Sequence, residues 1–472
     1  MSHLILNNNQ ASILEKKSFY IFLLYLVEII ALLLVALELY KISVFFVGIL
    51  VAVFLIYWFY NNPFALLPIY LLSILAGSFK LSGGNESTAG IPLTEFFFPI
   101  VVLITFIKLF HTEKQEFKKK YNILLSLYGG FLIWSFFTIV VAVDKPLAFG
   151  YWRNYFTGFI VFIFAFNFVN NYKHIKIFIL ALIIWGIILA FNEFYILFSL
   201  GGIPGGLVKI FLSKNLLATS WGRSNYFAAF YVLIIPISLG YFFYIKAFSK
   251  KIILTIVLLI MFSAIVLTLS RGGLLSLTIA LILLLSKLIK PKTFIPIMSL
   301  FIGVALILIL NPFTKVIYQG LSTVDSSLSY FSRLNFYEDV WNTFLKHPIT
   351  GVGLANLGYY SVFKITTSAA SAHNIILGTL GETGIVGSIL FISLLALSLI
   401  RTLKNFLNEK FERIKILQWS FFCGFIGVFI HSMMEPNFEG PQFAIMFWST
   451  FAVFIRLAEL NDEEKSNLVN NS

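Results

Sequence analysis

Charged residues are scarce in this chain, and their scarcity excludes most classes of protein. Asp, Glu, Lys and Arg make up 12% of its 472 residues, whereas 59% are hydrophobic. Soluble domains carry about 25% charged residues. This composition excludes a soluble globular enzyme, a disordered chain and a fibrous protein, and it leaves a polytopic membrane protein as the class that fits.

Cysteine and histidine are also too few for several kinds of site. The single cysteine, Cys423, excludes a disulfide framework and a thiolate metal cluster, and the six histidines are scattered. We therefore predict no metal site and no cofactor. The net charge of +13 does not indicate nucleic-acid binding, because the basic residues lie between apolar runs, where they report membrane topology.

Long apolar runs dominate the sequence and predict an all-α polytopic membrane protein with about 12–14 transmembrane helices. About 20 apolar residues cross a bilayer as a helix. Candidate spans cover 18–40, 42–60, 63–79, 91–110, 121–143, 155–172, 174–199, 225–245, 252–270, 272–290, 293–310, 373–400, 413–431 and 440–457. The first run is too long for a cleavable signal peptide, so we expect it to act as its own insertion signal.

Lysines between the runs predict that both termini are cytoplasmic. Outward-facing segments are then 80–90, 144–154, 200–224, the turn at Arg271, 311–372 and 432–439. The expected organisation is an N-terminal bundle (1–310), one long extracytoplasmic loop (311–372), C-terminal helices (373–458) and a polar cytoplasmic tail (459–472). We expect residues 461–472 of this tail to be disordered.

Arginine is used sparingly and in unusual places. Only seven of the 34 basic residues are arginine, yet Arg153, Arg223, Arg271 and Arg333 all fall in predicted outward segments. Guanidinium binds phosphate with two parallel hydrogen bonds and stays charged, whereas lysine is a point charge. We predict a cationic site for a lipid diphosphate that enters from the bilayer. The alternative, which stays open for Arg153, Arg223 and Arg271, is an interfacial anchor that reaches lipid headgroups.

The long outer loop contains a predicted amphipathic helix at 332–346 that lies on the membrane surface. Its apolar positions have helical spacing, with Ser332 as N-cap and His347-Pro348 as stop. Arg333 and Glu338 lie on or near its polar side, which can equally be a solvated face.

The next span begins with His373 and Asn374 at its outer mouth, and Glu382 lies about two turns deeper. Ionisable residues in an apolar span are costly and are therefore functional candidates. Neutral imidazole can accept a proton near neutral pH. Helix packing is the alternative for Glu382. Glu435 is a weaker candidate, and we predict that His431 beside it is an interfacial residue.

Four local patterns resemble the O-antigen ligase and O-antigen polymerase family. They are RSNYFAAFY, SRGGLLSL, SRLNFYEDVW with HPITGVGLAN, and HNIILGTLGETGIVG, which together cover about 220–390. The resemblance implies a GT-C-like, metal-independent membrane glycosyltransferase at the periplasmic face of the bacterial inner membrane. Its donor would be an undecaprenyl-diphosphate-linked glycan and its acceptor lipid A-core or another lipid-linked glycan. Family arginines that hold the diphosphate would match Arg223 and Arg271, and the family's loop histidine would match His373.

The residues fit that chemistry on their own terms. His373 can take the proton of an attacking sugar hydroxyl, and arginines can stabilise the departing diphosphate, which implies inversion at the anomeric carbon. We assign His373, Arg271 and Arg223 as catalytic candidates, and Arg333, Arg153, Asn374, Glu382 and Glu338 as substrate-binding candidates.

Two other functions remain open from the sequence. An O-antigen or exopolysaccharide polymerase would show the same residues, because loop shape selects the acceptor. A lipid-linked oligosaccharide flippase suits many spans, but it needs charged residues along a central cavity and often shows inverted repeats, and no repeat is visible here.

Overall fold

The computed structural model describes residues 53–76, 78–79, 91–111, 122–217, 224–290, 292, 295–296, 326–360, 372–408, 412–435 and 437–470. By its internal contacts the chain divides into two units, 1–66 and 67–472. In the first unit, residues 53–61 are helical and α3 begins at Pro63. Apart from the start of α3, everything described below belongs to the second unit.

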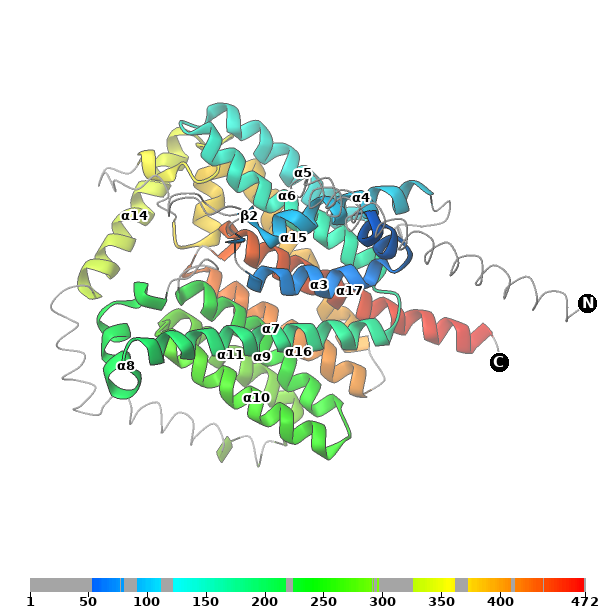
Figure 1. Cartoon of the computed structure of the whole chain (residues 1–472). Coiled ribbons are helices and arrows are strands. Elements are labelled where there is room, and N and C mark those ends of the chain that lie inside the picture. Colours follow the sequence, from blue (N-terminus) through cyan, green and yellow to red (C-terminus); the bar gives the residue numbers. More distant parts are fainter. Residues whose placement is uncertain are drawn as a thin grey trace, which may run out of the picture. The chain divides into compact units, whose positions relative to one another are not determined.

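The described part of the chain is almost entirely helical (Figure 1). The helices are α3 (Pro63–Ser73), α4 (Leu93–His111), α5 (Asn122–Phe137), α6 (Lys145–Phe168), α7 (Tyr172–Ser199), α8 (Gly202–Leu212), α9 (Ser224–Tyr244), α10 (Phe248–Leu267), α11 (Arg271–Leu288), α14 (Ser326–Lys346), α15 (Ile375–Asn408), α16 (Glu412–Ser432) and α17 (Pro441–Asn470). Short 3-10 turns are η1 (Ile74–Ala76), η2 (Thr138–Val141), η3 (Lys214–Leu217), η4 (Leu357–Tyr360) and η5 (Asn437–Glu439). Two-residue strands β1 (Ser78–Phe79) and β2 (Ile91–Pro92) pair antiparallel.

Among the described residues, eight helices are long and apolar enough to cross a membrane, which confirms the all-α polytopic membrane class. Most predicted runs match a helix to within a few residues. The run predicted at 155–172 differs at its start, because α6 already begins at Lys145, where the Asp144 side chain accepts from the Leu147 amide and Pro146 occupies the first turn. The runs predicted at 373–400 and 440–457 differ at their ends, because α15 continues to Asn408 and α17 to Asn470. The run 18–40, and most of the runs 42–60 and 293–310, lie outside the described residues.

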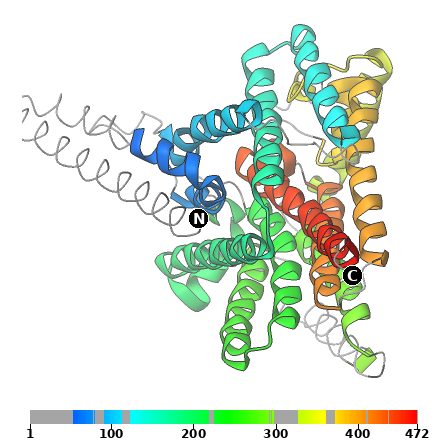
Figure 2. The same cartoon turned by 90° about the vertical axis from the view of Figure 1, so that its right-hand side faces the viewer.

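The helices differ in how much of their surface protein covers. The span Pro441–Leu460 in α17 is 94% buried and packs along α6, while α16 packs along α9 (Figures 1 and 2). By contrast, α10 exposes large apolar side chains, such as Phe248 and Ile253. Such a surface suits hydrocarbon as solvent, so α17 is an interior helix and α10 a lipid-facing one.

A sharp kink in α15 positions its outer end. Gly384 has φ 67° and ψ −169°, which breaks the helical hydrogen bonds and frees carbonyls of the preceding turn. The Gly381 carbonyl accepts from the Val352 amide and the Glu382 carbonyl from the Gly353 amide, at 3.0 and 2.8 Å. The Thr383 carbonyl accepts from the Trp134 indole at 2.8 Å. A backbone carbonyl without a hydrogen-bond partner is costly at membrane depth. The bonds from Val352 and Gly353 satisfy two such carbonyls and hold the loop after α14 against α15.

The helix α14 differs from its prediction at its start. It begins at Ser326, ahead of the predicted start at Ser332, and it ends at Lys346 as predicted. Phe336 and Val340 pack against Val352, Leu357 and Ala372, so its buried side faces protein. This side of α14 packs on protein because the loop after α14 folds back to cover it, while the placement of the helix on the membrane surface stays a prediction.

The polar C-terminal tail also differs from its prediction. We expected disorder from 461 onward, but the backbone of α17 is helical through Asn470. Residues 461–470 therefore continue the last span.

Contacts at the two ends of the helices agree with the predicted alternation of loops. At one end, the Asn356 side chain accepts from the Asp144 amide at 2.8 Å, and both residues belong to predicted outer segments. At the other end, Arg456 donates to the Val169 carbonyl at 3.0 Å and the Lys176 ammonium lies over the Tyr244 ring. Predicted outer segments thus meet outer ones, while the side of the membrane that each end faces stays a prediction.

Candidate functional site

His373 lies directly before α15, in a backbone conformation that few residues adopt. Its φ is 46°, in the left-handed region. Asn374 follows and caps the helix, because its side-chain oxygen accepts from the Ile376 and Leu377 amides at 3.0 and 3.1 Å. A non-glycine residue held at positive φ is strained, and such strain gathers at functional sites.

A carboxylate from another segment holds the imidazole of His373. The Nδ1 atom lies 3.2 Å from Oε2 of Glu435, which follows α16 in the chain. The other carboxylate oxygen, Oε1, accepts from the Asn225 side-chain amide in the first turn of α9 at 2.7 Å. The Glu435 side chain is 10% exposed and that of His373 40% exposed. Three segments distant in sequence therefore meet at one partly open polar cluster.

The loop that carries Glu435 is fixed by a second, buried network. The Asn437 side-chain amide lies 2.9 Å from Nδ1 of His431 and donates to the Ser432 hydroxyl at 2.8 Å. All three residues are buried. The prediction that His431 is interfacial is therefore wrong, because its ring is buried in protein. Its contact with Asn437 holds the loop that carries Glu435 in place.

Arg271 stands at the start of α11, beside the same loop. Ser270 caps this helix by accepting from the Gly273 amide. A Cβ atom on Gly272 would lie 3.5 Å from Met434 Cβ and 3.6 Å from His431 Cδ2, and one on Gly273 would lie 2.5 Å from Ala228 Cβ of α9. The two glycines thus let the N-terminus of α11 reach α9 and the loop holding Glu435. A helix N-terminus with an exposed guanidinium favours an anion.

The remaining candidates lie in other surroundings. Arg153 on α6 pairs with Glu95 on α4 at 3.3 Å. Glu338 is exposed on α14. Glu382 is buried at the kink of α15, where its backbone carbonyl accepts from the Gly353 amide. The side chain of Arg333, and Arg223 as a whole, lie outside the described residues.

Comparison with known protein families identifies the central part of the chain. Residues 256–392 match the family model described as O-Antigen ligase. This segment is an O-antigen ligase-family domain. The match confirms the resemblance read from the sequence, and it supports a membrane glycosyltransferase-like activity on lipid-linked glycans. No curated protein matches the chain.

The O-antigen ligase-family segment holds Arg271, Glu382 and His373, but it does not hold the whole polar cluster. Asn225 and Glu435 lie before and after the matched residues and contact His373 or each other across the fold. Sequence reasoning missed Asn225 and undervalued Glu435. The only sequence signal was an acidic residue in a short predicted outer loop.

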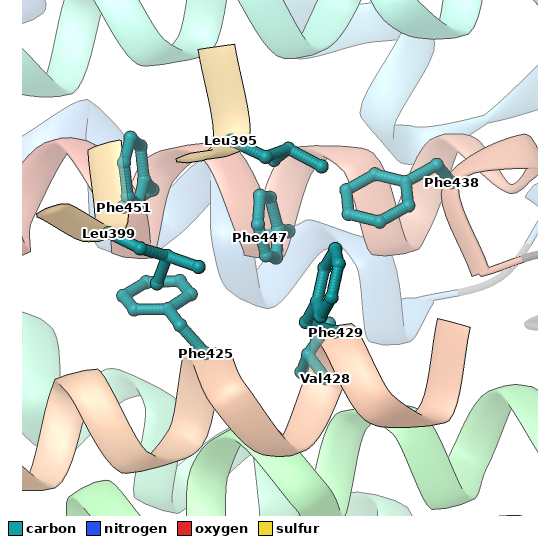
Figure 3. A pocket seen from close by; sticks show the side chains of 8 residues that line it. All are labelled: Leu395, Leu399, Phe425, Val428, Phe429, Phe438, Phe447 and Phe451. Atoms are coloured by element: carbon teal, nitrogen blue, oxygen red, sulfur yellow. The ribbon is translucent and has the colours of Figure 1, made fainter. Parts of the chain in front are cut away.

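An apolar pocket lies between the C-terminal helices of the chain (Figure 3). It is lined by leucines of α15 and by aromatic and aliphatic side chains of α16, η5 and α17: Leu395, Leu399, Phe425, Val428, Phe429, Phe438, Phe447 and Phe451. Its walls offer no side-chain donor or acceptor for a sugar or a phosphate. The polar cluster around His373 is therefore the better candidate for chemistry.

Proposed function

We propose that the chain is an O-antigen ligase that transfers a glycan from undecaprenyl diphosphate to a hydroxyl of lipid A-core, on the periplasmic face of the inner membrane. One observation carries the proposal. His373 and the N-terminus of α11, which bears Arg271, both adjoin the loop 431–435, at the end of the bundle where predicted outer segments meet. A proton acceptor and a fixed cation thus adjoin one loop at one end of the bundle.

His373 acts as the general base in this proposal. The acceptor hydroxyl attacks the anomeric carbon and gives its proton to the imidazole, so a new carbon–oxygen bond forms on one face of the sugar. The bond between the anomeric carbon and the diphosphate oxygen breaks on the opposite face, and its electron pair leaves with the diphosphate. Attack and departure on opposite faces invert the configuration of that carbon.

Arginines stabilise the departing diphosphate. Arg271 adds its guanidinium to the positive end of α11, and Arg223 belongs to the sequence directly before α9, which contacts the start of α11. We expect Arg333 and Arg153 to assist from other predicted outer segments. Asn374, Glu382 and Glu338 complete the predicted substrate site, with Glu382 acting through the shape of the kinked helix.

The experiment for this proposal uses purified protein in detergent with an undecaprenyl-diphosphate-linked glycan and lipid A-core. We expect transfer without any membrane gradient. Binding of the donor without transfer, and donor movement across liposomes instead, would favour the flippase alternative.

The polymerase alternative needs a different measurement. The gene is deleted and the envelope glycans are separated on a gel. Loss of all long chains from lipid A-core, with the lipid-linked polymer retained, is the result that a ligase predicts. Single repeat units left on the core would assign the chain as a polymerase.

A further inference from the structure

We infer that Glu435 is a positioning residue that sets the tautomer and orientation of His373, and that Asn225 in turn fixes Glu435. This inference deepens the proposed function and rests on it. It assigns roles to two residues outside the O-antigen ligase-family segment, one from the first turn of α9 and one from the loop after α16.

The hydrogen bonds fix the direction in which each group donates. An ionised carboxylate has only acceptor sites, and the Asn225 Nδ2 atom has only donors. Glu435 therefore accepts from Asn225 through Oε1, and it accepts the Nδ1–H of His373 through Oε2. With the proton of neutral imidazole held on Nδ1, the lone pair lies on Nε2, which is the atom that can accept a proton.

Burial makes this arrangement specific. The Glu435 side chain is 10% exposed, so little water competes for its two oxygens, whereas His373 is 40% exposed and remains open to a substrate. A shielded carboxylate attracts an imidazolium more strongly than an exposed one does. The ring therefore has a buried, fixed side and an accessible, reactive side.

The backbone on both sides of the contact supports a held geometry. His373 keeps its φ of 46° between the buried Ala372 and the capping residue Asn374. On the partner side, the Glu435 amide donates to the His431 carbonyl at 3.0 Å, and His431 is itself held by Asn437. Sites that rely on a precise angle need such a supporting framework.

The chemical step then balances without a proton on Glu435. The hydroxyl proton passes to Nε2 as the glycosidic carbon–oxygen bond forms and the diphosphate leaves. The resulting imidazolium is stabilised by the Glu435 carboxylate, and it later releases the same proton to water. Glu435 stays ionised throughout, as the carboxylate does in serine hydrolases.

The test is a double-mutant cycle on transfer rate in purified protein. We expect Glu435→Gln to lower kcat by about 10²-fold or more while the KM for the donor changes by less than about threefold, because the charge opposite His373 is lost but the diphosphate site is kept. In the His373→Ala background, the same Glu435→Gln change should alter the rate by less than about twofold, because Glu435 acts only through the imidazole.

A second variant keeps the test valid if Glu435→Gln does not fold, as judged by thermal unfolding in detergent. Asn225→Ala should also lower kcat. In the His373→Ala background, the same Asn225→Ala change should leave the rate unchanged. Glu412→Gln, at an exposed position on the opposite end of α16, is the matched control and should have the wild-type rate.

The outcomes separate this inference from the proposed function. Wild-type transfer by Glu435→Gln, or an equal fold loss with and without His373, would overturn the positioning role while the base role of His373 stands. Full transfer by His373→Ala would instead overturn the proposed function itself.

Discussion

At the scale of single residues, the choice of arginine at the start of α11 is informative because lysine dominates the chain elsewhere. Arg271 joins a capped helix N-terminus that already favours an anion. Its planar fork can bind two oxygens of a diphosphate, which an ammonium cannot do with the same geometry.

Two replacements of Arg271 distinguish the contribution of its positive charge from that of its planar guanidinium group. We expect Arg271→Ala to lower the transfer rate by about 10²–10³-fold, the cost of losing one donor to a developing negative charge. Arg271→Lys should recover part of that loss, because it keeps the charge without the fork. Equal rates for Arg271→Lys and wild type would contradict a need for bidentate binding, and Lys287→Arg at the opposite end of α11 is the control.

The residue scale also shows what the sequence could and could not predict. His373 and Arg271 were identifiable because an ionisable group beside an apolar run is costly and therefore conspicuous. The partner of His373 was not, since Glu435 lies 62 residues away and Asn225 lies 210 residues before Glu435. Only the packing of α9, α11 and α16 brings those segments together.

At the scale of elements, the kink in α15 holds the loop after α14 in place through backbone hydrogen bonds. Gly351 has φ 63°, and a Cβ atom there would lie 2.4 Å from the Glu382 carbonyl carbon. The loop and the kink therefore depend on each other, and the loop covers one side of α14 through Val352 and Leu357.

We expect Gly351→Ala to destabilise the protein by about 1–3 kcal/mol, because it adds backbone strain and a clash with backbone atoms that cannot move aside. The measurement is thermal unfolding in detergent. Gly129→Ala on α5, where a Cβ atom has nothing within 4 Å, should be neutral or slightly stabilising. An unchanged midpoint for Gly351→Ala would contradict the mutual dependence of the loop and the kink.

Elements were the most predictable part of the fold, with one instructive exception. Helix bounds followed from apolar runs, because bilayer thickness fixes their length. The buried side of α14 was not predicted, since Phe336 is buried while Trp341 and Leu345 are exposed. Periodicity identifies an amphipathic helix, but the loop that folds over it decides which residues are buried.

At the scale of the whole molecule, topology can be tested with cysteine labelling. The only cysteine, Cys423, is buried, so Cys423→Ala gives a background without reactive thiols. We expect a cysteine at Trp341 to react with a membrane-impermeant maleimide in intact spheroplasts. A cysteine at Lys250 should react only after permeabilisation, because loops rich in lysine and arginine remain on the cytoplasmic side of the membrane. Labelling of the cysteine at Lys250 in intact spheroplasts, with the cysteine at Trp341 labelled only after permeabilisation, would contradict the predicted orientation. It would place the site on the cytoplasmic side.

The central claim is that a proton acceptor and a fixed cation at the outer mouth of the bundle carry out glycan transfer. The most direct measurement compares the transfer rates of wild type, His373→Ala and Arg271→Ala in purified protein with a synthetic undecaprenyl-diphosphate glycan. The account predicts losses of about 10²–10⁴-fold for His373→Ala and about 10²–10³-fold for Arg271→Ala, with unchanged unfolding temperatures. Wild-type rates in both variants would contradict it.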